Sequence, residues 1–115
     1  MHDFRRLIAW QKANALEVRM DPYIDRIMKV RPTLADQLER SVGSIASNVS
    51  EGCGRETKAD FRRFLTMAIA STTETENHLI RAQQRGLITA ADFESLTANT
   101  TEVRKLMNGL RRSLE

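Results

Sequence analysis

Few side chains in this 115-residue sequence have the types and spacing that catalysis or metal binding requires. The single cysteine, Cys53, excludes an intrachain disulfide and a thiolate-rich zinc site, and no histidine lies near it in sequence. The two histidines, His2 and His78, form no Glu-x-x-His motif of the kind found in di-iron helical bundles. Ser44 and the serines near it lack a candidate base. We therefore expect no enzyme, no catalytic residue, no metal and no cofactor.

The side chains that could bind a ligand are cationic. Eighteen lysines and arginines oppose fifteen acidic residues, and fourteen of the cations are arginines, whose planar guanidinium suits phosphate contacts. Backbone N–H groups near Arg55 could also meet an anion, with a solvated basic turn as the simpler interpretation. Because aromatic residues are scarce, contacts to a phosphate backbone would dominate over base stacking. The candidates for nucleic-acid binding are Arg5, Arg6, Lys12, Arg55, Lys58, Arg62, Arg63, Arg104, Lys105, Arg111 and Arg112.

Helix start and stop patterns divide the chain into four long segments, residues 3–30, 33–52, 57–86 and 89–115. Each of the last three begins with a threonine followed three positions later by an aspartate, an imperfect capping box. This predicts helix N-caps at Thr33, Thr57 and Thr89. Glycines at 52–54 and at Gly86 would end two of these helices in the left-handed conformation.

Apolar residues recur at helical spacing within each segment. Pro22 interrupts the first stripe and predicts a kink or a break near Met20–Asp21, because proline removes a helical hydrogen bond. Long helices joined by short loops run antiparallel to their neighbours, so the sequence predicts a single all-α domain over residues 1–115, an antiparallel up-and-down four-helix bundle. The predicted core stripes are Phe4, Ile8, Ala15, Leu16, Met20, Ile24, Ile27 and Met28; Leu38, Val42, Ile45 and Val49; Phe61, Phe64, Leu65, Ala68, Thr72, Thr75 and Leu79; and Phe93, Leu96, Thr100, Val103, Met107, Leu110 and Leu114.

The second segment also carries a polar stripe beside its apolar one, formed by Gln37, Ser41, Ser44, Asn48 and Glu51. This stripe is either a seam partly buried against another helix or another subunit, or a solvated face. The only tryptophan lies at the edge of the apolar face of the first segment, where a subunit contact or core packing would accommodate it. The candidate assembly or structural residues are Trp10, Gln37, Ser44, Asn48, Glu51, Gly52 and Gly54.

Four motifs occur together in this chain: Trp10-Gln11-Lys12-Ala13; Gln37-Leu38-x-Arg40; Ser44-Ile45-x-x-Asn48-Val49-x-Glu51-Gly52-x-Gly54-Arg55; and Phe61-x-x-Phe64-Leu65-x-x-Ala68-x-x-Ser71-x-x-Glu74-x-Glu76-x-x-Leu79. From Phe4 to about Leu110 the sequence resembles the bacterial four-helix-bundle proteins encoded within 23S rRNA intervening sequences. The resemblance implies a homopentamer around a central channel, with structural or assembly roles for Ser44, Asn48, Glu51, Gly54 and Arg55. It also implies kinship with the accessory variability determinant of diversity-generating retroelements, a basic pentamer that binds nucleic acid and a reverse transcriptase.

These observations lead to one expected function and one alternative. We expect a non-enzymatic homo-oligomer, a pentamer by resemblance, that binds RNA or DNA through its basic surface. The alternative is a protein-interaction scaffold that binds no nucleic acid. The longest apolar runs fall well short of a membrane span or a secretory signal, so the expected location is the cytoplasm, with no membrane partner.

Overall fold

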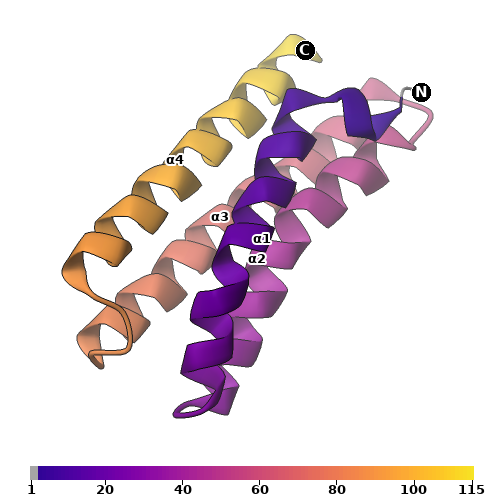
Figure 1. Cartoon of the computed structure of the whole chain (residues 1–115). Helices are drawn as coiled ribbons and strands as arrows, with labels where there is room; N and C mark the ends of the chain where they lie inside the picture. The colour runs from indigo at the N-terminus through magenta and orange to yellow at the C-terminus, as the bar shows by residue number, and fades with distance from the viewer. Residues whose placement is uncertain (1–2) are drawn as a thin grey trace.

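The computed structural model describes residues 3–115, and four α-helices account for most of that range. A short 3-10 turn, η1 (Phe4–Arg6), precedes α1 (Ile8–Met28), α2 (Pro32–Cys53), α3 (Lys58–Gln84) and α4 (Ala90–Ser113). Each helix runs antiparallel to the one before it, in an elongated molecule of 43 × 21 × 20 Å (Figure 1). No β-strand occurs within the described range. The predicted all-α up-and-down four-helix bundle is confirmed.

The core lies along the inner faces that apolar periodicity predicts for the last three helices. All four stripe residues of α2 are fully buried, as are Leu65 and Leu79 in α3 and Leu96 and Met107 in α4. Residues nearer the end of α4 are only partly buried. The stripe predictions for these helices are confirmed, because each continuous stripe has only one way to face the bundle interior.

The stripe predicted for the first helix is wrong in part. Ile8 is 62% exposed, and Ala15 and Met28 are exposed as well. Ala9 and Ala13 take the inner positions instead. The buried face continues the four- and three-residue steps of Leu16, Met20, Ile24 and Ile27 back toward the start of the helix, and these steps reach the two small alanines rather than the larger isoleucine.

No break occurs at Pro22, because α1 continues from Ile8 to Met28 through this residue. Pro22 lies on the exposed side of the helix, and so does Val18, whose carbonyl loses its helical partner. Water can hydrogen-bond to that carbonyl, so the helix tolerates the proline.

Two of the three predicted N-caps are confirmed. The Thr57 and Thr89 hydroxyl oxygens each accept a hydrogen bond of 3.1 Å, from the backbone N–H of Asp60 and Asp92 respectively. The Thr33 prediction is wrong, since α2 begins at Pro32 and no side chain caps it. Proline is favoured as the first helical residue because its φ already fits the helix, and this places Thr33 inside the first turn.

The glycines end their helices in different ways. Gly86 has a φ of 70°, the left-handed conformation predicted for it. Gly54 follows α2 with a φ of −82°, so the prediction of a left-handed glycine there is wrong. Gly52 lies inside α2, where a Cβ atom would come within 2.7 Å of the Phe64 Cβ. At this position the glycine permits close contact between α2 and α3.

Candidate nucleic-acid interface

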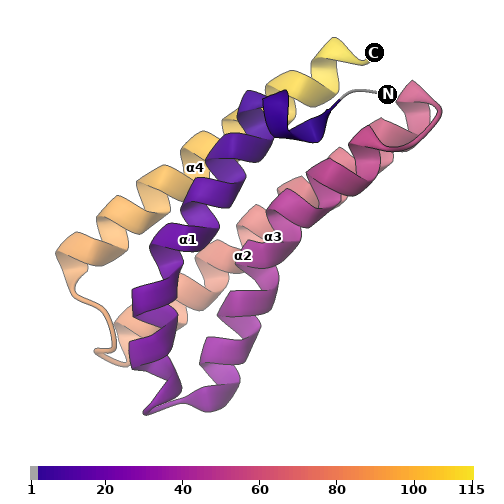
Figure 2. The ribbon, with the colours of Figure 1, turned by 45° about the vertical axis from the view of Figure 1, so that its right-hand side comes forward.

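The topology of the bundle brings together cations that are far apart in the sequence. The start of α1, the turn between α2 and α3, and the end of α4 all lie at one end of the molecule (Figures 1 and 2). We call the half of the bundle nearest this end the basic half, which comprises residues 3–17, 44–70 and 102–115. It contains eleven cationic side chains and seven carboxylates. The remaining residues, 18–43 and 71–101, contain seven cationic side chains and eight carboxylates. All eleven candidate residues lie in the basic half.

Some of these cations are neutralised by nearby carboxylates. Arg55 lies 2.9 Å from Glu51, and Arg63 lies 2.9 Å from Asp60. Arg5 pairs with Asp3 at 2.8 Å, and its hydrogen bonds hold the pKa of that carboxyl below its usual value. These exposed pairs contribute little to stability, but they reduce the positive field at each arginine.

Three other candidates connect helices. Arg104 of α4 hydrogen-bonds to Glu76 and Thr72 of α3, and only a quarter of the Arg104 and Glu76 side chains is exposed. Arg62 donates to the backbone carbonyl of Leu114. Arg111 donates to Thr66 at 3.2 Å and to Asn108 at 3.0 Å. These contacts hold α4 against α3 and leave fewer donors for a ligand.

Five candidates make neither an ion pair nor a side-chain hydrogen bond among residues 3–115, and all five are exposed: Arg6, Lys12, Lys58, Lys105 and Arg112. They come from three separate segments of the chain, so the unpaired charge extends across the basic half. A polyanion could meet these cations without first displacing a carboxylate.

The turn between α2 and α3 is a less favourable anion site than its sequence suggests. The Thr57 hydroxyl already occupies an N–H group at the start of α3, and Asp60 places a negative charge in the first turn. Arg55 and Arg63 both lie 4.7 Å from the centre of the Phe64 ring, where cation–π contacts hold their guanidinium groups. The turn is therefore mostly satisfied within the chain.

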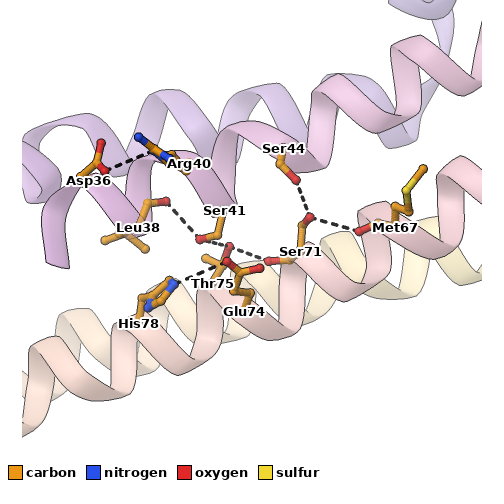
Figure 3. A network of polar contacts seen from close by, with 10 residues as sticks. All are labelled: Asp36, Leu38, Arg40, Ser41, Ser44, Met67, Ser71, Glu74, Thr75 and His78. Carbon is orange, nitrogen blue, oxygen red and sulfur yellow. Dashed lines mark hydrogen bonds and ion pairs between the residues drawn. The ribbon is translucent and has the colours of Figure 1, made fainter. Parts of the chain in front are cut away.

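The polar stripe of α2 is partly buried against α3 of the same chain (Figure 3). The Thr75 hydroxyl donates to Ser41 at 3.0 Å or to the Ser71 carbonyl at 2.8 Å, and the Ser44 and Ser71 hydroxyls share a hydrogen bond. Asn48 donates to the Ser44 carbonyl at 2.8 Å. Of the two interpretations that the spacing allows, a seam against another helix therefore holds for the serines.

The two ends of this stripe remain exposed, at Gln37 and Glu51. Trp10 is half-buried and contacts the Phe4 ring edge-on at a centroid distance of 5.1 Å. It therefore packs η1 onto the bundle. The sequence did not predict that Ser71 and Thr75 of α3 are the hydrogen-bond partners of the α2 serines. These two hydroxyl residues lie four positions apart on one helix face, and that pattern could have indicated them.

His78 and Cys53 are the remaining side chains with reactive chemistry. Both are buried, and the two His78 ring nitrogens make no hydrogen bond, although Nε2 lies 3.7 Å from a Glu74 carboxylate oxygen. Within the range 3–115, no three His, Cys, Asp or Glu residues cluster as metal ligands do. His2 lies outside the described residues.

None of the described helices combines the length and apolar character that a membrane crossing demands.

Fold and surface together define a class: a small antiparallel helical bundle whose two ends differ in charge. The chain belongs to the 23S rRNA-intervening sequence protein family, whose model matches residues 5–109. It is also similar to a crystal structure from Bacteroides thetaiotaomicron, described as a protein with unknown function from the S23 ribosomal protein family. The two chains are 25% identical with a TM-score of 0.85, and the similarity covers 90% of this chain and 98% of that one. A comparison with curated proteins finds no match.

Proposed function

We propose that this protein is a non-enzymatic homo-oligomer that binds the phosphate backbone of RNA or DNA through its basic half. The observation that carries this proposal is the unequal distribution of charge between the two halves of the bundle. Cations outnumber carboxylates by four in the basic half and are outnumbered by one in the other. Such a field raises the local concentration of a polyanion around one end of the molecule.

The unpaired cations support backbone contacts rather than recognition of single bases. Arg6, Lys58 and Arg112 are exposed and belong to η1, the start of α3 and the end of α4, three segments that meet at the same end of the bundle (Figure 1). Each phosphate that they neutralise would release condensed counterions, so binding would weaken steeply as salt is added. The Trp10 ring packs against Phe4, which leaves it poorly placed for stacking on a base.

A groove between α1 and α4 supports the assembly part of the proposal. It has a volume of about 390 Å³ and is lined mainly by apolar atoms, with Ile8 and Leu106 at its surface. Ile8 is 62% exposed and Leu106 is 36% exposed. A second copy of the chain that covered these side chains would gain about 25 cal/mol for each Å² of apolar surface removed from water.

Titration of labelled RNA and duplex DNA at two salt concentrations tests nucleic-acid binding. We expect binding at low salt that the triple variant Arg6→Gln, Lys58→Gln, Arg112→Gln weakens at least tenfold, with a salt slope smaller by up to about 3. The control is the triple variant Arg26→Gln, Lys29→Gln, Arg40→Gln, which removes the same charge from the opposite half. Equal losses in both variants would mean that net charge, and not the basic half, determines binding.

The alternative function is a protein-interaction scaffold. The exposed ion pairs, such as Arg40 with Asp36 at 3.2 Å, support it, since they show arginines used within the chain. Absence of binding to either nucleic acid at low salt, for a chain of unchanged helicity, would favour the scaffold and reject the nucleic-acid proposal.

A further inference from the structure

A second group of arginines lies at the opposite end of the bundle, around a pocket of about 350 Å³. The pocket is formed where the turn between α1 and α2 meets the last turn of α3, and no candidate cation of the basic half lines it. Among the residues that line it are Arg31, Thr33, Leu34, Gln37, Arg81 and Arg85.

The three arginines of this pocket have no counter-charge. None of them has an ion pair within the described chain, and no carboxylate lines the pocket. Arg81 lies in the last turn of α3 and Arg85 is the C-cap of the same helix, so both belong to one helix end. Three positively charged residues thus line one hollow, and a bound anion would lower the repulsion between them.

Helix dipoles explain only part of this arrangement. Arg81 and Arg85 lie at the C-terminal end of α3, where a cation is favourable. Arg31 is the N-cap of α2, where the helix dipole disfavours a cation. A bound anion would make the position of Arg31 favourable.

The start of α2 supplies free backbone donors to the same pocket. Arg31 makes no side-chain cap, Pro32 has no N–H, and the first turn contains no acidic residue. The N–H groups of Thr33 and Leu34 have no acceptor among the hydrogen bonds of residues 3–115. By contrast, α3 and α4 each have a threonine cap and an aspartate in the first turn. The amide group of Gln37, one turn along α2, provides a further donor.

We propose that this pocket binds a phosphate group. Arginines from two separate segments line it together with the N-terminal residues of α2. Guanidinium forks and helix N-terminal N–H groups suit a tetrahedral anion with several acceptor oxygens better than a planar carboxylate. The phosphate could be free, part of a small molecule, or the terminal phosphate of a nucleic-acid strand. The inference does not depend on the proposed function, because it uses none of the candidate cations of the basic half.

The test is a titration of inorganic phosphate followed by NMR of the Thr33 and Leu34 amides, with chloride at matched ionic strength as reference. We expect saturable shifts of both amides with phosphate and not with chloride. Arg81→Gln and Arg85→Gln should each weaken phosphate binding about tenfold. The control is Arg26→Gln, which removes one exposed cation from the same half without touching the pocket, and it should leave the affinity unchanged.

A second arm identifies the source of the phosphate. A dinucleotide with a 5′-phosphate is compared with the same dinucleotide bearing a 5′-hydroxyl. If the 5′-phosphorylated dinucleotide binds more tightly than both inorganic phosphate and the 5′-hydroxyl dinucleotide, the source is a nucleic-acid end. If its affinity does not exceed that of inorganic phosphate, the source is a small phosphate compound. Phosphate shifts no larger than those with chloride, or an affinity that neither Arg81→Gln nor Arg85→Gln alters while circular dichroism shows intact helices, would overturn the inference.

Discussion

At the scale of single residues, Gly52 sets how closely α2 approaches α3. A Cβ atom there would lie 2.7 Å from the Phe64 Cβ and 2.9 Å from Phe61 Cδ1. Gly52→Ala should lower the free energy of unfolding by about 1–2 kcal/mol, because overpacking outweighs the gain in helix propensity. Gly109→Ala is the matched control, since a Cβ there meets nothing within 4 Å, and it should raise stability by about 0.5–1 kcal/mol. Urea unfolding followed by circular dichroism measures both.

A second residue-scale prediction concerns Glu17. Burial raises the pKa of this carboxyl, and the negative charges of Asp21 and Glu39 raise it further. The folded protein therefore holds the Glu17 proton more tightly than the unfolded chain does, and ionised Glu17 lowers stability at neutral pH. This loss of folding stability is present at pH values above the raised pKa and disappears as the pH falls through that pKa.

Glu17→Gln should therefore stabilise the protein at pH 7, by an amount that shrinks as the solution is acidified. Urea unfolding at pH 7 and at pH 4 measures this difference. The exposed carboxylate Glu102 provides the control, because Glu102→Gln should give no such gain. A gain for Glu17→Gln that stayed constant across this range would contradict the assigned cause.

At the scale of elements, Thr33 and Thr57 share one sequence pattern, a threonine followed three positions later by an aspartate, but only Thr57 caps a helix. Thr57→Ala should lower the free energy of unfolding by about 1 kcal/mol, because a backbone N–H of α3 loses its acceptor. Thr33→Ala should change it by less than about 0.5 kcal/mol, because α2 already begins at Pro32. Denaturant unfolding of both variants checks this, and equal losses would place the start of α2 at Thr33.

At the scale of the whole molecule, the α1–α4 groove predicts an assembly. Light scattering at micromolar concentration should give a mass that is a multiple of 13.1 kDa. Ile8→Asp and Leu106→Asp should return the mass to that of one chain, because each places a charge on the apolar surface. Ile80→Asp alters a 42% exposed residue on α3 and should leave the assembly intact. A single-chain mass for the unaltered protein would reject the homo-oligomer.

Much of the fold could be predicted because it rests on short-range interactions. The spacing of Leu38, Val42, Ile45 and Val49 places them on one face of a helix whatever surrounds it. The Thr57 and Thr89 caps join residues three positions apart. The start of α2 at Pro32 was not predicted because two local patterns overlap there, a proline suited to the first helical position and the Thr33-x-x-Asp36 capping pattern. The proline determines where the helix begins.

The sequence by itself determined the four helices, their order, three of the four core stripes, and the scarcity of side chains suited to catalysis. Only the tertiary structure decided which distant groups meet. The segments that hold Arg6 and Arg112, η1 and the end of α4, lie at one end because successive helices run antiparallel (Figure 1). Ser44 hydrogen-bonds to Ser71 because α2 and α3 pack on those faces. Arg31, Arg81 and Arg85 surround one pocket for the same reason. Helical periodicity is set within a few residues, whereas the rotation and packing of each helix depend on contacts between segments far apart in the chain.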